Sequence, residues 1–237
     1  MTGLIYKELL THKKQLFAVL AVVLFFTGWN IVPPLTAHDL TAQELTLFLG
    51  LSMISVISVG AFEQGIFESD EIKIWQSYIA SSPDGVRLQI ASKYIFNAAL
   101  TLAVVFLLEI SFYISGAING SDVSVCNTIL ILLASTQFIL RAVETPFIVR
   151  FGSKMGNMYR MILISVLTTA ATMYGLFGDL SVFGGSFGEV LVRFMDIIRD
   201  KTSYILWFYP VVSLVLYWIS CHISYRFYLK GGEHYDK

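Results

Sequence analysis

Six long apolar stretches constrain the fold of this chain more than any other feature of its sequence. The predicted membrane spans cover residues 16–32, 45–62, 94–115, 128–149, 161–177 and 204–225. Each stretch is about as long as a helix that crosses the hydrocarbon core of a bilayer. Of the 237 residues, 56% are hydrophobic and only 14% are charged, which is far from the composition of a soluble domain. We therefore predict an all-α integral membrane protein in which residues 1–237 form a single transmembrane domain.

The N-terminal segment should form a helix of its own. Residues 1–15 are expected to lie in the membrane interface as an amphipathic helix, because apolar and charged side chains alternate with helical spacing. The apolar ones are Leu4, Ile5, Leu9 and Leu10, and the charged ones are Lys7, Glu8, Lys13 and Lys14. The apolar run that follows lacks a small-residue cleavage site, so we expect it to be retained as a span. Pro33 and Pro34 should end that span, since neither can donate a backbone hydrogen bond.

Lysine and arginine are distributed unevenly among the predicted loops, which indicates the orientation of the chain. Three occur in each of the N-terminal segment, the central connector (residues 63–93), a compact loop expected at 150–160 and the C-terminal tail. The loop 116–127 has none. The positive-inside rule therefore places both termini in the cytoplasm, and we expect the plasma membrane as the location. Residues 186–201 are an exception: their mixed charges and helical apolar spacing predict an amphipathic helix on the outer face.

The central connector contains a predicted short helix over residues 69–82. Ser69 can cap its N-terminus, and Asp70 and Glu71 then lie next to the positive end of the helix dipole. The apolar residues Ile72, Trp75 and Ile79 recur at helical spacing. A capped helix of this kind, held between two spans, is suited to docking against something outside the membrane.

A turn should end this helix. Residues 82–85, Ser-Pro-Asp-Gly, fit a type I turn, after which a second helix can start at Val86. Exposed Trp75 and Tyr78 favour a protein partner, because aromatic side chains are enriched at the energetic centres of interfaces. The alternative is that both aromatic rings anchor the helix in the headgroup layer of the membrane.

Three charged residues fall inside predicted spans, where an isolated charge costs about 2.5–3.5 kcal/mol on insertion scales. Arg141 and Glu144 lie one helical turn apart in the fourth span, and Glu109 lies in the third. These residues either line a substrate pathway or form structural contacts. We favour a structural ion pair for Arg141 and Glu144, with Arg141 extending towards the inner headgroups. Glu109 stays open between the two roles.

Several patterns resemble catalytic or ligand motifs but lack essential parts. Residues 184–188 match G-x-S-x-G around Ser186, yet no strand-like run precedes that serine. Residues 60–65 have the glycine spacing of a phosphate loop, but Ile66 and Phe67 replace the required Lys and Ser or Thr. The histidines do not have metal-ligand spacing. We therefore expect no catalytic, cofactor or metal site. Cys126 and Cys221 fall near opposite faces of the membrane, which argues against a disulfide.

Three segments, taken together and in order, resemble the membrane subunit of type-two ABC exporters, especially small six-span bacterial permeases whose ATPase is a separate chain. They are residues 3–10 followed by Lys13-Lys14, residues 70–94 with their Ser82-Pro83 turn, and residues 146–152. Together they span more than half of the chain. The chain departs from the family pattern after Ser82-Pro83, where only Arg87 remains of a stretch that is usually more basic.

The resemblance implies a permease that forms a translocation pathway with a second permease chain and works by alternating access. ATP and Mg²⁺ would bind to the separate ATPase, with no cofactor in this chain. Residues 1–15 would be the elbow helix and residues 69–82 the coupling helix of the family. The ATPase contacts would be Asp70, Glu71, Lys73, Trp75, Gln76, Tyr78 and Pro83. The cargo would be a peptide or another amphiphile, by family analogy alone. The alternatives are a non-ABC membrane scaffold or secondary transporter and, ranked last, an intramembrane hydrolase using Ser186.

Overall fold

The computed structural model describes residues 2–35, 42–68, 85–120, 124–177 and 204–231. Throughout these ranges the regular elements are α-helices, which confirms the predicted all-α class for this part of the chain. The helices are α1 (Thr2–Thr11), α2 (Lys13–Leu35), α3 (Ala42–Glu68), α5 (Gly85–Asn119), α6 (Ser124–Phe151), α7 (Ser153–Phe177) and α9 (Tyr204–Gly231). The predicted helices at 69–82 and 186–201 lie outside the described residues.

A helix covers each of the six predicted spans, and four stretches are long and apolar enough to cross a membrane. These stretches are Lys13–Ile31, Gly85–Ile118, Ser124–Phe151 and Trp207–Leu229. In α3 the corresponding apolar stretch among the described residues is shorter, Leu49–Val59. The 35-residue α5 extends over about 52 Å, well beyond the roughly 30 Å of a hydrocarbon core. The fold is therefore that of a multi-pass membrane protein.

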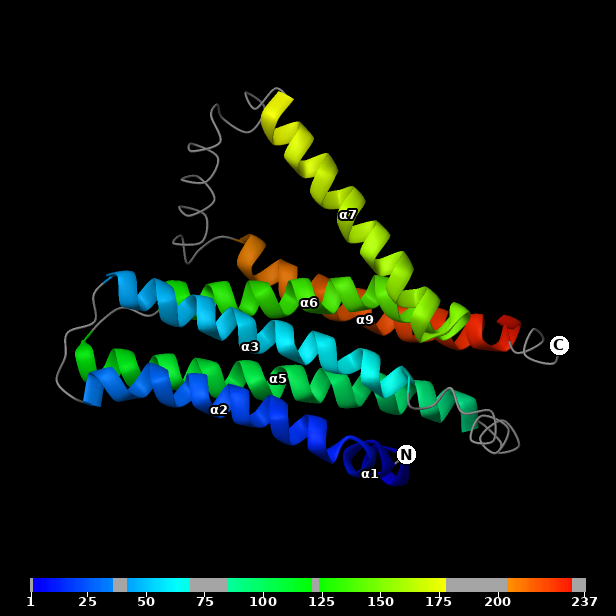
Figure 1. Cartoon of the computed structure of the whole chain (residues 1–237), viewed down its shortest axis with the longest axis horizontal. Coiled ribbons are helices and arrows are strands. Elements are labelled where there is room, and N and C mark those ends of the chain that lie inside the picture. The colour runs from blue at the N-terminus through cyan, green and yellow to red at the C-terminus, as the bar shows by residue number, and fades with distance from the viewer. Residues whose placement is uncertain (1, 36–41, 69–84, 121–123, 178–203, 232–237) are drawn as a thin grey trace.

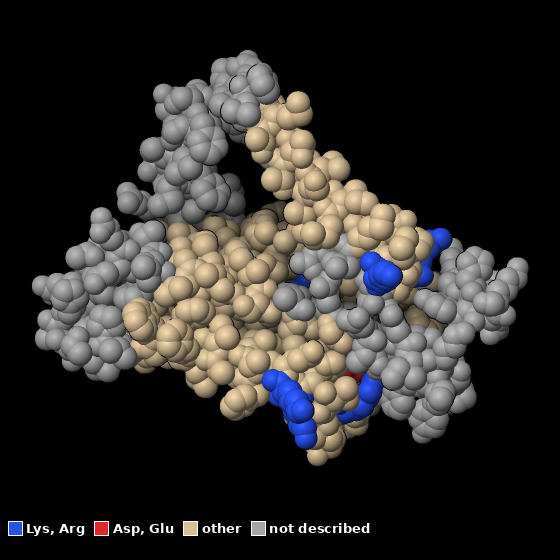
Figure 2. Space-filling view, in the orientation of Figure 1, with Lys and Arg blue, Asp and Glu red and all other residues tan. Residues whose placement is uncertain are grey.

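The helices form an elongated bundle with clearly different ends (Figure 1). Helix α1, the end of α3, the start of α5, the corner between α6 and α7 and the end of α9 lie at one end. Lysine and arginine side chains gather towards this end on the face drawn in Figure 2, whereas the other half of that face shows none among the described residues. We call this end the basic end. Helix α7 leaves the bundle there and diverges from it (Figure 1).

Two of the apolar clusters join three or more helices of the bundle. The larger one joins α2, α3, α5 and α6, and its buried residues include Val23, Val56, Val104, Leu108 and Leu130. The second joins α5, α6 and α9 through Ile90, Tyr94, Phe138 and Tyr217. Because lipid tails are as apolar as these side chains, close packing rather than the hydrophobic effect stabilises such contacts in a membrane.

Polar side chains add specific links between the helices. The Asn30 side-chain amide of α2 donates hydrogen bonds to the hydroxyl oxygens of Ser52 in α3, at 3.3 Å, and Ser111 in α5, at 3.2 Å. Two other serines of α3, Ser55 and Ser58, instead donate to carbonyls of their own helix. One amide thus connects three helices away from the basic end.

Helix α9 is fixed to α5 by a tyrosine. The Tyr94 hydroxyl lies 2.8 Å from the hydroxyls of both Ser220 and Ser224, all three residues being buried. The Tyr217 hydroxyl donates to the backbone carbonyl of Tyr94 at 3.0 Å, and the two tyrosine rings are in contact. Residues more than 120 positions apart are thereby held in register.

The boundaries of the first two helices differ from the sequence predictions. The predicted interfacial helix of residues 1–15 is interrupted at His12, so that α1 ends at Thr11 and Lys13 already belongs to α2. Helix α2 continues through Pro33 and Pro34 to Leu35. Only Leu35 follows the two prolines, so they end the helix one residue after Pro34 instead of before Pro33.

The segment 150–160 is not the compact loop that its charges suggested. Helix α6 continues to Phe151, Gly152 turns the chain with a φ of 84°, and α7 begins at Ser153. A glycine is favoured there because the left-handed backbone region excludes most side chains. Gly156 then allows α7 to approach α6: a Cβ atom at this position would lie 2.6 Å from Ile148 Cγ1. The two helices therefore meet in a tight corner.

Candidate functional site

The candidate site surrounds the two flanks of segment 69–84 at the basic end. Helix α3 ends at Glu68 and α5 begins at Gly85, one residue before the predicted start. The seven predicted ATPase contacts, from Asp70 to Pro83, lie outside the described residues, and their roles stay predictions. What the structure does describe is how the flanks of this segment are held.

Lys93 of α5 joins the two flanks directly. Its ammonium group donates a 2.7 Å hydrogen bond to the backbone carbonyl of Ile66, in the last turn of α3. The last four carbonyls of a helix have no partner within the helix, and a cation there is also favoured by the helix dipole. Lys93 is 2% exposed and Ile66 is fully buried, so the contact is shielded from solvent. It connects the end of α3 to the first part of α5 across the segment.

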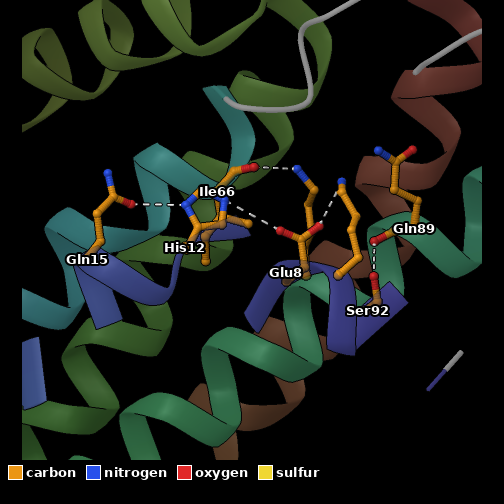
Figure 3. A network of polar contacts seen from close by, with 8 residues as sticks. Glu8, His12, Gln15, Ile66, Gln89 and Ser92 are labelled. Carbon is orange, nitrogen blue, oxygen red and sulfur yellow. Dashed lines mark hydrogen bonds and ion pairs between the residues drawn. The ribbon is translucent and has the colours of Figure 1, made fainter. Parts of the chain in front are cut away.

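The N-terminal helix packs against the same place (Figure 3). Glu8 of α1 is buried, with one carboxylate oxygen 3.4 Å from Lys7 Nζ and the other 3.7 Å from His12 Nε2. His12 Nδ1 in turn lies 3.0 Å from Gln15 Oε1. The His12 ring meets Phe62 of α3 edge-on, with ring centroids 5.7 Å apart.

Apolar contacts complete this arrangement. Ile5 of α1 packs against the cluster of Phe62, Ile66 and Phe96, which come from α3 and α5. On the opposite side of α1, Tyr6, Leu9 and Leu10 are exposed. The helix therefore directs polar Glu8 into the protein and an apolar face outwards, as a helix bordering lipid would. We call Glu8, His12, Gln15, Ile66 and Lys93 the polar brace.

The predicted intramembrane charges lie in two different cavities. Arg141 and Glu144 line a cavity of about 460 Å³ between α3, α6 and α7, together with Gln137 and Tyr159. Glu109 lines another, of about 490 Å³, between α5, α6 and α9. The structure thus brings Arg141 and Glu144 to one cavity and leaves Glu109 apart from them.

Arg141 is among the largest fully buried side chains of the described residues. Its Nη1 donates a 2.9 Å hydrogen bond to the Thr101 hydroxyl of α5, and Thr101 donates to the Asn97 carbonyl. It therefore turns into the bundle rather than towards the headgroups, because a protein acceptor is within reach. Asn97 beside it is fully buried, and neither side-chain amide atom has a hydrogen-bond partner within the described residues. The Arg141–Glu144 ion pair stays a prediction.

The corner between α6 and α7 adds an aromatic group to the basic end. The rings of Phe147, Phe151 and Tyr159 contact one another, with centroids 5.2–6.4 Å apart. The Arg150 guanidinium lies over the rings of Phe151, at 5.3 Å, and Phe227 of α9, at 5.1 Å. This corner corresponds to residues 146–152, the third segment of the resemblance stated above. It ties α6, α7 and α9 together at the basic end.

These features define a multi-pass α-helical membrane protein whose segment 69–84 is flanked by a braced junction. A family model described as ABC-2 family transporter protein matches residues 3–229. The chain belongs to this family, which confirms the resemblance to type-two ABC permeases. Membership makes the chain a membrane transport component and implies an ATPase partner. No curated protein and no solved structure matches the chain.

Sequence reasoning missed the polar brace as a site. The sequence alone places Lys93 in the central connector and Glu8 on the charged face of an interfacial helix. The four-residue spacing of Glu8 and His12 is a local signal that could have paired them. No local pattern connects Lys93 to Ile66, because the two residues are 27 positions apart in the sequence.

Proposed function

We propose that this chain is the permease subunit of an ABC exporter, coupled through residues 69–82 to a separate ATPase that binds ATP and Mg²⁺. The chain would pair with a second permease chain, identical or related, in the plasma membrane of a bacterium. Membership of the ABC-2 family supports this over a non-ABC scaffold or secondary transporter, and over hydrolysis at Ser186. That serine lies outside the described residues.

The polar brace is the observation that carries the coupling mechanism. A displacement of segment 69–84 can drive transport only if it moves the membrane-spanning helices. A deformation confined to the segment and its flanks would not reach them. Lys93 ties the end of α3 to the start of α5, and α1 packs on both. A partner that moves this segment would therefore move three helices together. Closure of two ATPase subunits would in this way change the side to which the pathway opens.

The distribution of charge supports a cytoplasmic position for this junction. Helix α1, the two flanks of segment 69–84, the α6–α7 corner and the end of α9 belong to the basic end (Figures 1 and 2). By the positive-inside rule, that end faces the cytoplasm, where an ATPase is located.

The cavity that holds Arg141 and Glu144 supports an amphiphilic cargo such as a peptide. Its remaining lining is mostly apolar and includes Ile57, Phe147 and Ile162. Apolar walls with a few polar groups are typical of sites that bind and orient small organic molecules. A charged or peptide group would contact the polar residues of α6, and an apolar group the side chains of α7.

The test is co-purification of this chain with the ATPase encoded in a neighbouring reading frame, a soluble protein carrying GxxxxGK[ST]. Trp75→Ala and Glu71→Arg should each weaken the complex or separate ATP hydrolysis from export. Trp29→Ala is a matched control, because Trp29 is an exposed tryptophan of α2, away from the basic end. Unchanged association and transport in both connector variants would contradict the proposal.

A further inference from the structure

A groove between α5 and α9 at the basic end belongs neither to the polar brace nor to the Arg141 cavity. Its volume is about 320 Å³. The lining residues of α5 are Arg87, Ile90, Ala91, Tyr94, Ile95 and Ala98. Those of α9 are Tyr217, Trp218, Cys221, His222 and Tyr225. None of these groups has a role in the mechanism proposed above.

The groove has a cationic end and an apolar body. Arg87 is exposed and forms no ion pair within the described residues. Near it, the Trp218 ring lies 4.5 Å from the His222 ring, and Trp218 is 65% exposed. Tryptophan and tyrosine are enriched at the depth of lipid headgroups, where one part of the ring is in water and the rest in hydrocarbon. From Arg87 towards Ala98, the α5 residues that line the groove are isoleucine and alanine, apart from Tyr94.

The length of the groove corresponds to one leaflet of a bilayer. From Arg87 to Ala98 the α5 wall rises about 16 Å, close to half of the roughly 30 Å hydrocarbon core. The α5 side of the groove includes the small side chains of Ala91 and Ala98, and the α9 side includes the rings of Tyr217 and Trp218. Such a channel, open at its side, fits an acyl chain with its headgroup at Arg87.

We propose that this groove binds one anionic phospholipid of the leaflet at the basic end. The phosphate would pair with the Arg87 guanidinium, whose planar set of donors suits phosphate oxygens. One acyl chain would lie between Ile95 and Trp218. A zwitterionic lipid fits the same walls, but its positive headgroup would offset the attraction to Arg87. Basic pockets between transmembrane helices at the cytoplasmic side are known to bind such headgroups.

The position of Arg87 gives this lipid a regulatory role, which rests on the proposed function. Arg87 lies in the first turn of α5, directly after segment 69–84. A headgroup bound there would hold that end of α5 at the membrane surface. The lipid content of the leaflet would then bias the position from which the ATPase moves the segment.

Native mass spectrometry of the full chain, released from nanodiscs of equal parts phosphatidylglycerol and phosphatidylcholine, tests binding independently of transport or ATPase association. The chain should retain one phosphatidylglycerol in preference to phosphatidylcholine. Arg87→Gln should reduce this preference about five-fold, equivalent to about 1 kcal/mol per basic residue near an anionic surface. Ala91→Leu should reduce retention of both lipids by filling the groove. Arg226→Gln and Ala18→Leu, both exposed and outside the groove, are the matched controls and should change neither.

Three outcomes would overturn the proposal. Equal retention of the two lipids would show that the groove does not select an anionic headgroup. An equal effect of Arg226→Gln would mean that general surface charge, and not this groove, attracts the lipid. Thermal stabilisation of the detergent-solubilised chain by inorganic phosphate alone, equal to that by phosphatidylglycerol, would identify a free-anion site instead. A preference for phosphatidylglycerol that Arg87→Gln reduces, with weaker retention of both lipids in Ala91→Leu and no change in the two controls, would support the proposal.

Discussion

Replacing Lys93 by methionine tests the polar brace most directly. Methionine keeps most of the length and the apolar stem of lysine but cannot donate to the Ile66 carbonyl, 2.7 Å away. A hydrogen bond to a charged group contributes about 1.5–3 kcal/mol net, and in the variant the Ile66 carbonyl would stay buried without the Lys93 donor. Loss of the buried charge also relieves its desolvation cost, which keeps the net effect in the lower part of that range. We expect a destabilisation of about 2 kcal/mol and a fall in Tm of about 4–8 °C for a chain of this size.

The assay is thermal unfolding of the purified chain in detergent, followed by tryptophan fluorescence, together with amide hydrogen exchange. Exchange should accelerate mainly in the last turn of α3 and the first turns of α5, where the contact lies. Lys154→Met is the matched control, because Lys154 is exposed on α7. If Lys93→Met leaves both Tm and local exchange unchanged, or raises Tm, the contact does not hold the flanks of segment 69–84 and the coupling argument fails.

Three further substitutions probe the interhelical contacts, each checked by thermal unfolding. Gly156→Ala should destabilise the chain by about 1–3 kcal/mol through overpacking against Ile148. The control Gly28→Ala, with no atom within 4 Å of the added methyl group, should be neutral or slightly stabilising. Equal effects of the two substitutions would refute the tight corner. Tyr94→Phe should cost about 0.6–1.7 kcal/mol, because both serine hydroxyls on α9 lose their interhelical partner; no loss would mean that these serines bond equally well within α9. Asn30→Ala should cost about 1–2 kcal/mol by releasing α2 from α3 and α5, and a stability equal to wild type would show that the amide is dispensable.

The apolar helices could be predicted from the sequence, since a chain crossing hydrocarbon needs long uninterrupted apolar runs. The corner at Gly152 could not. The polar and basic residues of 150–160 suggested a loop, but charge density does not distinguish a loop from a helix end at the membrane surface. A single glycine with a positive φ reverses the chain there, and its conformation depends on the packing of α7 against Ile148. The effect of Pro33 and Pro34 was misplaced only slightly, because α2 ends at Leu35, just after them, and not before them.

The candidate site was predictable only in part. Arg141 stood out as a charge inside an apolar run, and the structure gives it a buried hydrogen bond. Its choice of Thr101 as partner depends on how α5 packs against α6, which no local pattern specifies. Lys93 had no distinguishing mark at all, since a lysine before a span is usually solvated or extends to the headgroups. Its role arises from the end of another helix that lies beside it in space.

Helix α5 also sets how movement at one side of the membrane would reach the other. From Val86 to Ser115 it contains neither proline nor glycine, the residues at which long helices commonly bend. It therefore has no built-in hinge between Lys93 near one end and Ser111, the partner of Asn30, near the other. A tilt imposed at the basic end would be transmitted along α5 to its far part, where the Ser111 hydroxyl accepts a hydrogen bond from Asn30.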